Sequence, residues 1–202
     1  AELVKLTENS FRDVNIAFAN EISMICHQFS INVRELIDIC NNHSRVNILN
    51  PGCGVGGHCI AVDPWFIVSS IPEMSKLIKT SRLVNNNKKE WVLNKIIEEI
   101  TKYKFEFKKD PLLGFLGIAF KANVDDLRES PACQIVMDLI CLGNKLLVCE
   151  PNLKSHKTLN LIPLEDVIKE ADIIFTLVAH DEFKNSTILK NHSRLIDFSY
   201  SL

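Results

Sequence analysis

The apolar run Leu112-Leu-Gly-Phe-Leu-Gly-Ile-Ala-Phe120 decides the fold class of this chain of 202 residues. An uninterrupted apolar segment of this length is typical of a buried strand, and a polar loop over residues 121–129 follows it. Further helices are expected at 131–143 and 164–170, and further strands at 145–149, 173–178 and 195–198. This alternation predicts a doubly wound parallel α/β sheet, whose ligand crevice lies where the polar loop leaves the first strand.

The chain before this run has helical patterns only. Residues 1–29 carry an apolar stripe at spacings of three and four, which predicts one long helix. Asn32 and Glu35 have the spacing of a capping box and indicate the start of a second helix. Further helices are expected at 65–70, with Pro64 at the first position, and after Pro72.

A charged stretch over residues 102–110 lacks an apolar period, and we interpret it as the domain boundary. The expected organisation is an all-helical domain over residues 1–107 followed by an α/β domain over residues 108–202.

The composition indicates an ordinary globular protein. The chain has 47% hydrophobic and 24% charged residues, and its net charge of −2 gives no indication of attraction to nucleic acid or membrane surfaces. No apolar run reaches the roughly 18 residues needed to span a bilayer. The seven cysteines are odd in number and scattered, which favours reduced thiols in a cytoplasm. No CxxC pair is present, so we expect no metal site.

The segment Asn50-Pro-Gly-Cys-Gly-Val-Gly-Gly-His-Cys-Ile-Ala-Val-Asp-Pro-Trp65 is the strongest candidate for a functional site. Four glycines within six positions lead directly to His58 and Cys59, and Asp63 follows four residues later. Bare backbone N–H groups can hold anionic ligands, so this loop can present the thiol to a phosphorylated substrate. The alternatives are a flexible linker, a partly buried His58 and an Asp63 that only caps the next helix.

Two groups of basic and polar residues are also candidates for a functional site. Lys5, Asn9 and Arg12 share one face of the first helix and can hold a polar substrate, or they form a solvated face. Lys121 and Arg128 belong to the polar loop at the expected crevice, or they serve solubility alone.

Three segments together resemble one family. They are Ala1–Asn9, the loop Gly54-Val-Gly-Gly-His-Cys59 with Asp63, and Gly117–Ser130, and they match nucleotide-sugar 6-dehydrogenases, the UDP-glucose/GDP-mannose dehydrogenase family. The resemblance covers nearly the whole chain. It implies a central helical dimerisation domain over residues 1–107 and a small Rossmann-like, nucleotide-sugar-binding domain over residues 108–202. The run His58–Val68 resembles the branch that oxidises UDP-N-acetylmannosamine.

The resemblance also implies roles for individual residues. Cys59 would trap the C6 aldehyde as a thiohemiacetal that is oxidised to a thioester, and water would release the uronate. Lys5 would exchange protons and stabilise oxyanions, while Asn9 and Asp63 would orient the lysine or the water. Contacts with the nucleotide sugar would come from Arg12, Gly56 and Lys121, contacts with a neighbouring subunit's site from His43 and Arg45, and a contact with NAD from Arg128.

Family members carry an N-terminal Rossmann domain with a glycine fingerprint for NAD, and this chain has no G-x-G-x-x-G after a strand. We therefore expect this chain to be the central and C-terminal portion of such a dehydrogenase, and we expect it to have no dehydrogenase activity alone. It is expected to act in the cytoplasm, as a homodimer through its central helices, on precursors of cell-surface polysaccharides. The alternatives are a portion of a UDP-N-acetylglucosamine or UDP-glucose 6-dehydrogenase, or a non-catalytic module that dimerises and binds nucleotide.

Overall fold

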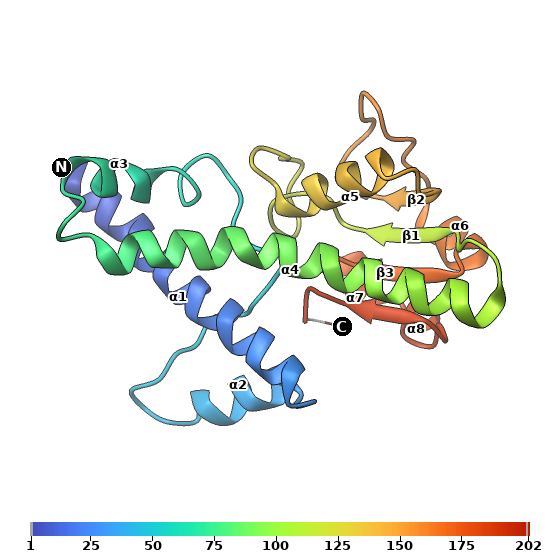
Figure 1. Cartoon of the computed structure of the whole chain (residues 1–202), viewed down its shortest axis with the longest axis horizontal. Coiled ribbons are helices and arrows are strands. Elements are labelled where there is room, and N and C mark those ends of the chain that lie inside the picture. The colour runs from blue at the N-terminus through green and yellow to red at the C-terminus, as the bar shows by residue number, and fades with distance from the viewer. Residues whose placement is uncertain (1, 201) are drawn as a thin grey trace.

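The computed structural model describes residues 2–200 and 202, and one long helix runs through both of its halves (Figure 1). The helical half consists of α1 (Glu2–Gln28), α2 (Val33–Asn41), α3 (Asp63–Ser70) and the first part of α4 (Lys76–Phe107). Helix α1 packs across α4, and the remainder of α4 continues along the α/β half.

The second half is a parallel sheet with helices on both faces, which confirms the predicted fold class. Its elements are β1 (Leu113–Leu116), α5 (Pro131–Cys141), β2 (Leu146–Cys149), α6 (Leu164–Glu170), β3 (Ile173–Thr176), α7 (Asp181–Lys184), α8 (Thr187–Lys190) and β4 (Leu195–Asp197). The strand order is β2-β1-β3-β4, and every pair is parallel. The short helices α7 and α8 were not expected from the sequence.

Strand β1 is shorter than the apolar run that predicts it. Its four residues are all buried, and the strand ends before Gly117, which has a φ of +80°. A side chain at Gly117 would collide with the carbonyl oxygen of Val178, so the turn out of the sheet requires glycine. The N–H groups of Ile118 and Ala119 then bond to the Glu150 carboxylate instead of a neighbouring strand.

The sheet separates two apolar cores. One core lies under α4 and α5, where residues of α4 meet the alternate residues Leu113 and Phe115 of β1. Phe115 stacks on Phe175 of β3 with a centroid distance of 5.4 Å. The other core lies under α6, α7 and α8 and includes Leu116 and Ile174. Helix α4 therefore contributes to the core of the α/β half as well as to the helical half.

Most of the charged stretch over residues 102–110, which we interpret as the domain boundary, is helical, and the boundary remains a prediction. Helix α4 continues to Phe107 because Ile96, Ile100 and Tyr103 keep helical spacing on its buried face, while the charged residues face solvent. The Tyr103 hydroxyl donates to the Asp172 carboxylate at 2.6 Å. The helix ends at Lys108, whose φ is +54°.

Several local signals act as predicted. The Asn32 side chain accepts hydrogen bonds from the N–H groups of Arg34 and Glu35 and caps α2. Pro131 begins α5 as predicted, and the Ser130 side chain, for which no cap was predicted, accepts the Cys133 N–H. Gly143 follows the end of α5 with a φ of +80°. These are sequence-local hydrogen bonds and dihedral preferences, which is why a sequence can reveal them.

Candidate functional site

The glycine loop, residues 50–62, lies between α4 and the segment after β1. An added side chain at Gly54 would stand 2.9 Å from the Asn85 carbonyl oxygen of α4. One at Gly56 would stand 2.5 Å from the Glu129 carbonyl oxygen. Gly56 is itself buried. These two glycines therefore allow the loop to pack against the chain itself, which is a different reason from the open anion cradle expected of the loop.

A buried chain of hydrogen bonds anchors the start of this loop. The Gly52 N–H donates to Asn20 Oδ1 at 2.9 Å, and Asn20 Nδ2 donates to Asn85 Oδ1 at 2.8 Å. Asn85 in turn donates to the Asp13 carboxylate, which also pairs with Arg82 at 2.6 Å. Burial raises the pKa of Asp13, and Arg82 opposes this effect. Helices α1 and α4 thus hold the start of the loop through polar contacts, and the neighbouring Cys53 packs into the apolar core under α4.

The loop ends at Cys59, and the structure brings two of the predicted catalytic residues together beside it. The Asp63 N–H donates to the Cys59 carbonyl oxygen at 2.7 Å. Asn9 Nδ2 of α1 donates to Asp63 Oδ2 at 2.6 Å, although the two residues are 54 positions apart. Helix α3 begins at Asp63 without a side-chain cap, so the carboxylate does not act as the helix cap. Cys59 is half-buried and belongs to neither core, and Lys5 is exposed one turn before Asn9.

Arg12 and Arg45 line a groove of about 580 Å³ together with Asn9. His43 lies at the edge of the same turn, where its Nδ1 accepts a hydrogen bond from the Arg45 N–H at 3.2 Å. The structure therefore brings Arg12 and Arg45 to one groove within a single chain. A contribution of His43 and Arg45 to a neighbouring subunit remains a prediction.

A second groove, of about 330 Å³, lies between the glycine loop and the carboxyl ends of β1 and β3. Its walls include residues 119–122 and 177–179, and Lys121 and Lys184 supply positive charge. This is the crevice position that the sequence predicts for the ligand of the parallel sheet. We call it the sheet-edge groove. Gly56 is not among its lining residues, because that glycine packs against Glu129 instead.

The Arg128 side chain is bound within its own loop. Its guanidinium forms a fork with the Asp126 carboxylate at 3.0 and 2.6 Å, and these hydrogen bonds lower the pKa of Asp126 to about 2. The Arg128 carbonyl oxygen accepts the Gly57 N–H at 2.9 Å. Arg128 therefore connects the loop after β1 with the glycine loop, and its contact with NAD remains a prediction.

The first β-α turn of the sheet does not fit a dinucleotide. A pyrophosphate normally sits against the helix that follows the first strand. Here Ser130 caps that helix, and added side chains at Gly54 and Gly56 would stand 3.2 and 3.0 Å from the Pro131 ring, so the glycine loop covers the helix start. Within residues 2–200 and 202, no group of three or more His, Cys, Asp or Glu could hold a metal ion.

Sequence reasoning missed a buried polar pair that contacts or adjoins residues lining the sheet-edge groove. Glu150 follows β2 directly and His180 lies four residues after β3, and both are nearly inaccessible to solvent. The available signal was a charged or polar residue immediately after a short apolar strand, since such positions meet at the carboxyl edge of a parallel sheet.

Comparisons with known proteins agree with a helical half followed by an α/β half. Residues 1–87 match the family model described as UDP-glucose/GDP-mannose dehydrogenase family, central domain. Residues 114–200 match the one described as UDP-glucose/GDP-mannose dehydrogenase family, UDP binding domain. The class of protein is therefore that of the nucleotide-sugar dehydrogenases. The chain belongs to the UDP-glucose/GDP-mannose dehydrogenase family, as the sequence motifs predict.

Individual relatives share about half of their length with this chain. UDP-N-acetyl-D-mannosamine dehydrogenase of Campylobacter jejuni is 52% identical over 191 residues, which are 91% of this chain and 46% of that protein. NDP-N-acetyl-D-galactosaminuronic acid dehydrogenase of Ralstonia solanacearum is 48% identical over 202 residues, 97% of this chain and 46% of that protein. The UDP-D-ManNAc dehydrogenase structure from Pyrococcus horikoshii has a TM-score of 0.83 at 36% identity, covering 98% of this chain and 47% of that one. In the described part of our chain, no helix is long and apolar enough to cross a membrane.

Proposed function

We propose that this chain is the substrate-handling portion of an NAD-dependent UDP-N-acetyl-D-mannosamine 6-dehydrogenase. The observation that carries the proposal is the meeting of Asn9 with Asp63 directly beside Cys59. A half-buried cysteine whose backbone is bonded to the residue of an ordered amide–carboxylate pair suits covalent capture followed by hydrolysis. The relative at 52% identity supports this sugar, and the relative at 48% identity keeps other N-acetylated sugars as alternatives.

In the proposed reaction the C6 alcohol of the sugar is oxidised to an aldehyde and then to a carboxylate. The Cys59 thiolate adds to the aldehyde carbon and forms a thiohemiacetal, whose oxidation leaves a thioester. Water oriented by Asp63 and Asn9 attacks the thioester carbon, which releases the uronate and returns the thiol. Lys5 accepts and returns the protons of these steps.

NAD would accept one hydride in each oxidation. Since the first β-α turn of this sheet does not fit a dinucleotide, we propose that another part of the enzyme binds NAD and that the chain alone is inactive. We further propose a cytoplasmic reaction that supplies uronates for cell-surface polysaccharides. The seven free cysteines support a reducing compartment.

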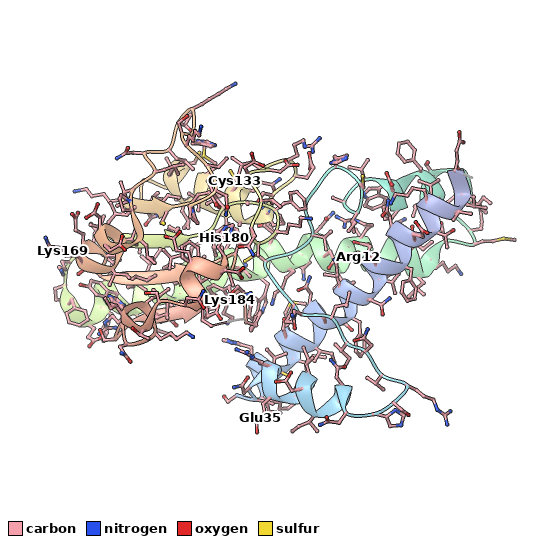
Figure 2. All side chains as sticks on the ribbon, turned by 180° about the vertical axis from the view of Figure 1, so that it is seen from behind. Arg12, Glu35, Cys133, Lys169, His180 and Lys184 are labelled. Carbon is pink, nitrogen blue, oxygen red and sulfur yellow. The ribbon has the colours of Figure 1, made fainter. Side chains whose placement is uncertain are left out.

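The sheet-edge groove is proposed to bind the nucleotide diphosphate, with Lys121 as a direct contact. Replacing Lys121 with alanine is expected to weaken UDP binding about 10- to 100-fold, because a hydrogen bond from an ammonium group to a phosphate contributes roughly 1.5–3 kcal/mol. Isothermal titration with UDP, UDP-N-acetylmannosamine and UDP-N-acetylglucosamine would measure the affinities. Lys169→Ala is the matched control, since Lys169 lies on α6 far from His180 and Lys184 (Figure 2). A wild-type chain that binds none of these ligands would refute the proposed site.

A second proposal is a homodimer formed through α1. Phe11, Phe18 and Ile25 recur every seven residues and are 70%, 52% and 45% exposed, and Phe29 extends the stripe at 69%. The buried face of α1 is instead small and polar, so the apolar stripe is left without a partner within the described chain.

Phe18→Asp is expected to shift the chain from dimer to monomer, because a carboxylate in the centre of the stripe would be buried without a partner. Sedimentation velocity at micromolar concentrations would measure the change. Phe105→Asp is the control, since Phe105 is 78% exposed on α4 and lies outside the stripe. A wild-type chain that sediments only as a monomer at high micromolar concentration would contradict the proposal. A homodimer is also expected of the alternative, a non-catalytic module that dimerises and binds nucleotide. Turnover of a UDP-sugar by the complete enzyme would rule this alternative out.

A further inference from the structure

A buried hydrogen bond between Glu150 and His180 lies next to the two loops that wall the sheet-edge groove. Glu150 is 3% exposed and His180 is 1% exposed. Nε2 of His180 lies 3.0 Å from Glu150 Oε1. His180 directly follows the groove residues 177–179, and it lies close to Lys184 near the junction of the two halves (Figure 2).

Glu150 holds the first part of the loop after β1. Its Oε2 accepts the N–H of Ile118 at 2.7 Å and that of Ala119 at 3.0 Å. The group is therefore a carboxylate, which can only accept hydrogen bonds.

His180 holds the other end of the same loop. The Asn123 N–H donates to His180 Nδ1 at 2.9 Å, and Asn152 Nδ2 lies 2.9 Å from the same atom. The Asn123 side chain also exchanges two hydrogen bonds with Asp181, at 2.8 and 3.1 Å. The groove-lining residues 119–122, which include Lys121, thus lie between two fixed points.

These partners define the tautomer of the imidazole. Nδ1 accepts a backbone N–H and must carry a lone pair, whereas Nε2 faces a carboxylate and must carry the proton. The neutral ring therefore donates to Glu150 and accepts from Asn123, whereas a protonated imidazolium would donate from both nitrogens and could not accept the Asn123 N–H.

We propose that His180, oriented by Glu150, is a positioning residue of the nucleotide-sugar site. As the neutral Nε2–H tautomer it fixes residues 118–123, and with them Lys121, against the sheet-edge groove. This inference rests on the proposed function of that groove. A binding group held by packing and by supporting hydrogen bonds loses less entropy when the ligand arrives.

Glu150→Gln tests the proposal with a minimal change. The glutamine oxygen can still accept the two backbone N–H groups, but its NH₂ faces His180 Nε2 and favours the Nδ1–H tautomer. That tautomer can no longer accept the Asn123 N–H. Glu182→Gln is the matched control, because Glu182 is exposed, lies two residues from His180 and loses the same charge.

Three readouts on the ¹⁵N-labelled 202-residue chain separate the outcomes. In the wild type we expect long-range ¹H–¹⁵N correlations of an Nε2–H imidazole for His180 and a protected Asn123 amide. In Glu150→Gln we expect the Nδ1–H pattern, Asn123 amide exchange at least 10-fold faster and UDP affinity about 10-fold weaker. Glu182→Gln should match the wild type in all three.

The proposal is overturned if wild-type His180 carries its proton on Nδ1, a result that does not depend on whether the variant folds. It is also overturned if Glu150→Gln binds UDP as tightly as the wild type with unchanged Asn123 exchange. In both cases UDP binding by the wild type would leave the proposed function intact. Absence of UDP binding by the wild type would instead overturn the proposed function, and this inference with it.

Discussion

Changing Cys59 to serine is expected to lower the rate of uronate formation by on the order of 10³-fold or more, because a serine hydroxyl is a far weaker nucleophile than a thiolate. The first oxidation does not need the thiol, so the sugar aldehyde should be formed and released. Asp63 and Asn9 should keep their hydrogen bond, since the Asp63 N–H contacts the backbone of Cys59 and not its side chain. The loss is therefore expected in the chemistry and not in the fold.

The measurement requires a complete enzyme that contains this chain and a dinucleotide-binding domain. Mass spectrometry of the sugar products would separate alcohol, aldehyde and uronate. Cys141→Ser serves as the control, because Cys141 is an exposed free thiol at the end of α5, away from the glycine loop. Uronate formation by the Cys59→Ser enzyme at nearly the wild-type rate would rule out covalent capture by this residue.

Lys88→Met is expected to remove a rise in stability with pH that the wild-type chain shows between pH 6 and 8.5. Lys88 is 0% exposed in the middle of α4. Its ammonium donates to Ser23 Oγ at 2.7 Å and to the Tyr200 hydroxyl at 3.1 Å, and it lies 4.1 Å from the Trp91 ring centroid. Among the described residues no carboxylate lies within ion-pairing distance of it. Burial therefore lowers the pKa of Lys88 from 10.5 to about 7.

The sign of the effect follows from proton binding. The unfolded chain keeps the lysine protonated up to about pH 10.4, whereas the folded chain releases the proton near pH 7, so the unfolded state binds more protons between these values. The free energy of unfolding must then increase with pH in this window, by about 2 kcal/mol from pH 6 to 8.5. Below the window the lysine is charged in both states and the full cost of its burial remains. Lys88→Met should consequently be more stable than the wild type at pH 6.

Urea unfolding followed by circular dichroism at pH 6, 7.5 and 8.5 would measure both chains. The measurements stop at pH 8.5, because burial raises the pKa of Cys53 and Cys149 to about 12 in the folded chain. At higher pH these thiols ionise more readily in the unfolded chain and so favour unfolding. Lys79→Met is the control on the exposed face of α4, with an expected change within about 0.5 kcal/mol. Equal pH dependence in the wild type and Lys88→Met would contradict the prediction.

The parts of the fold that were predictable are those decided within a few residues. The apolar run of β1, the cap at Asn32, the proline that begins α5 and the glycine after that helix depend on local hydrogen bonds, dihedral preferences and burial period. The charged stretch over residues 102–110 shows what composition alone does not reveal. Tyr103 continues the buried face of α4 there, because the sheet covers it.

The candidate site also has features that the sequence predicts and features that only the fold reveals. The glycine-rich loop and the family resemblance together selected Cys59, Asp63 and Asn9, and the identity of those residues is a property of the sequence. Spacing says nothing about which distant groups touch, so the contact between Asn9 and Asp63 had to come from the packing of α1 against α3.

The roles of residues outside any recognisable motif were decided by tertiary structure alone. Glu150 and His180 have a structural role only because three parallel strands end at one edge of the sheet. The segments after these strands leave backbone N–H groups that need hydrogen-bond acceptors. Lys88 acquires its lowered pKa only because α1 and the segment after β4 close over it. The sequence by itself determined the elements and the chemical groups they carry, since these follow from local chain chemistry. Desolvation and hydrogen bonds between distant segments determined which of those groups meet, and these exist only in the folded chain.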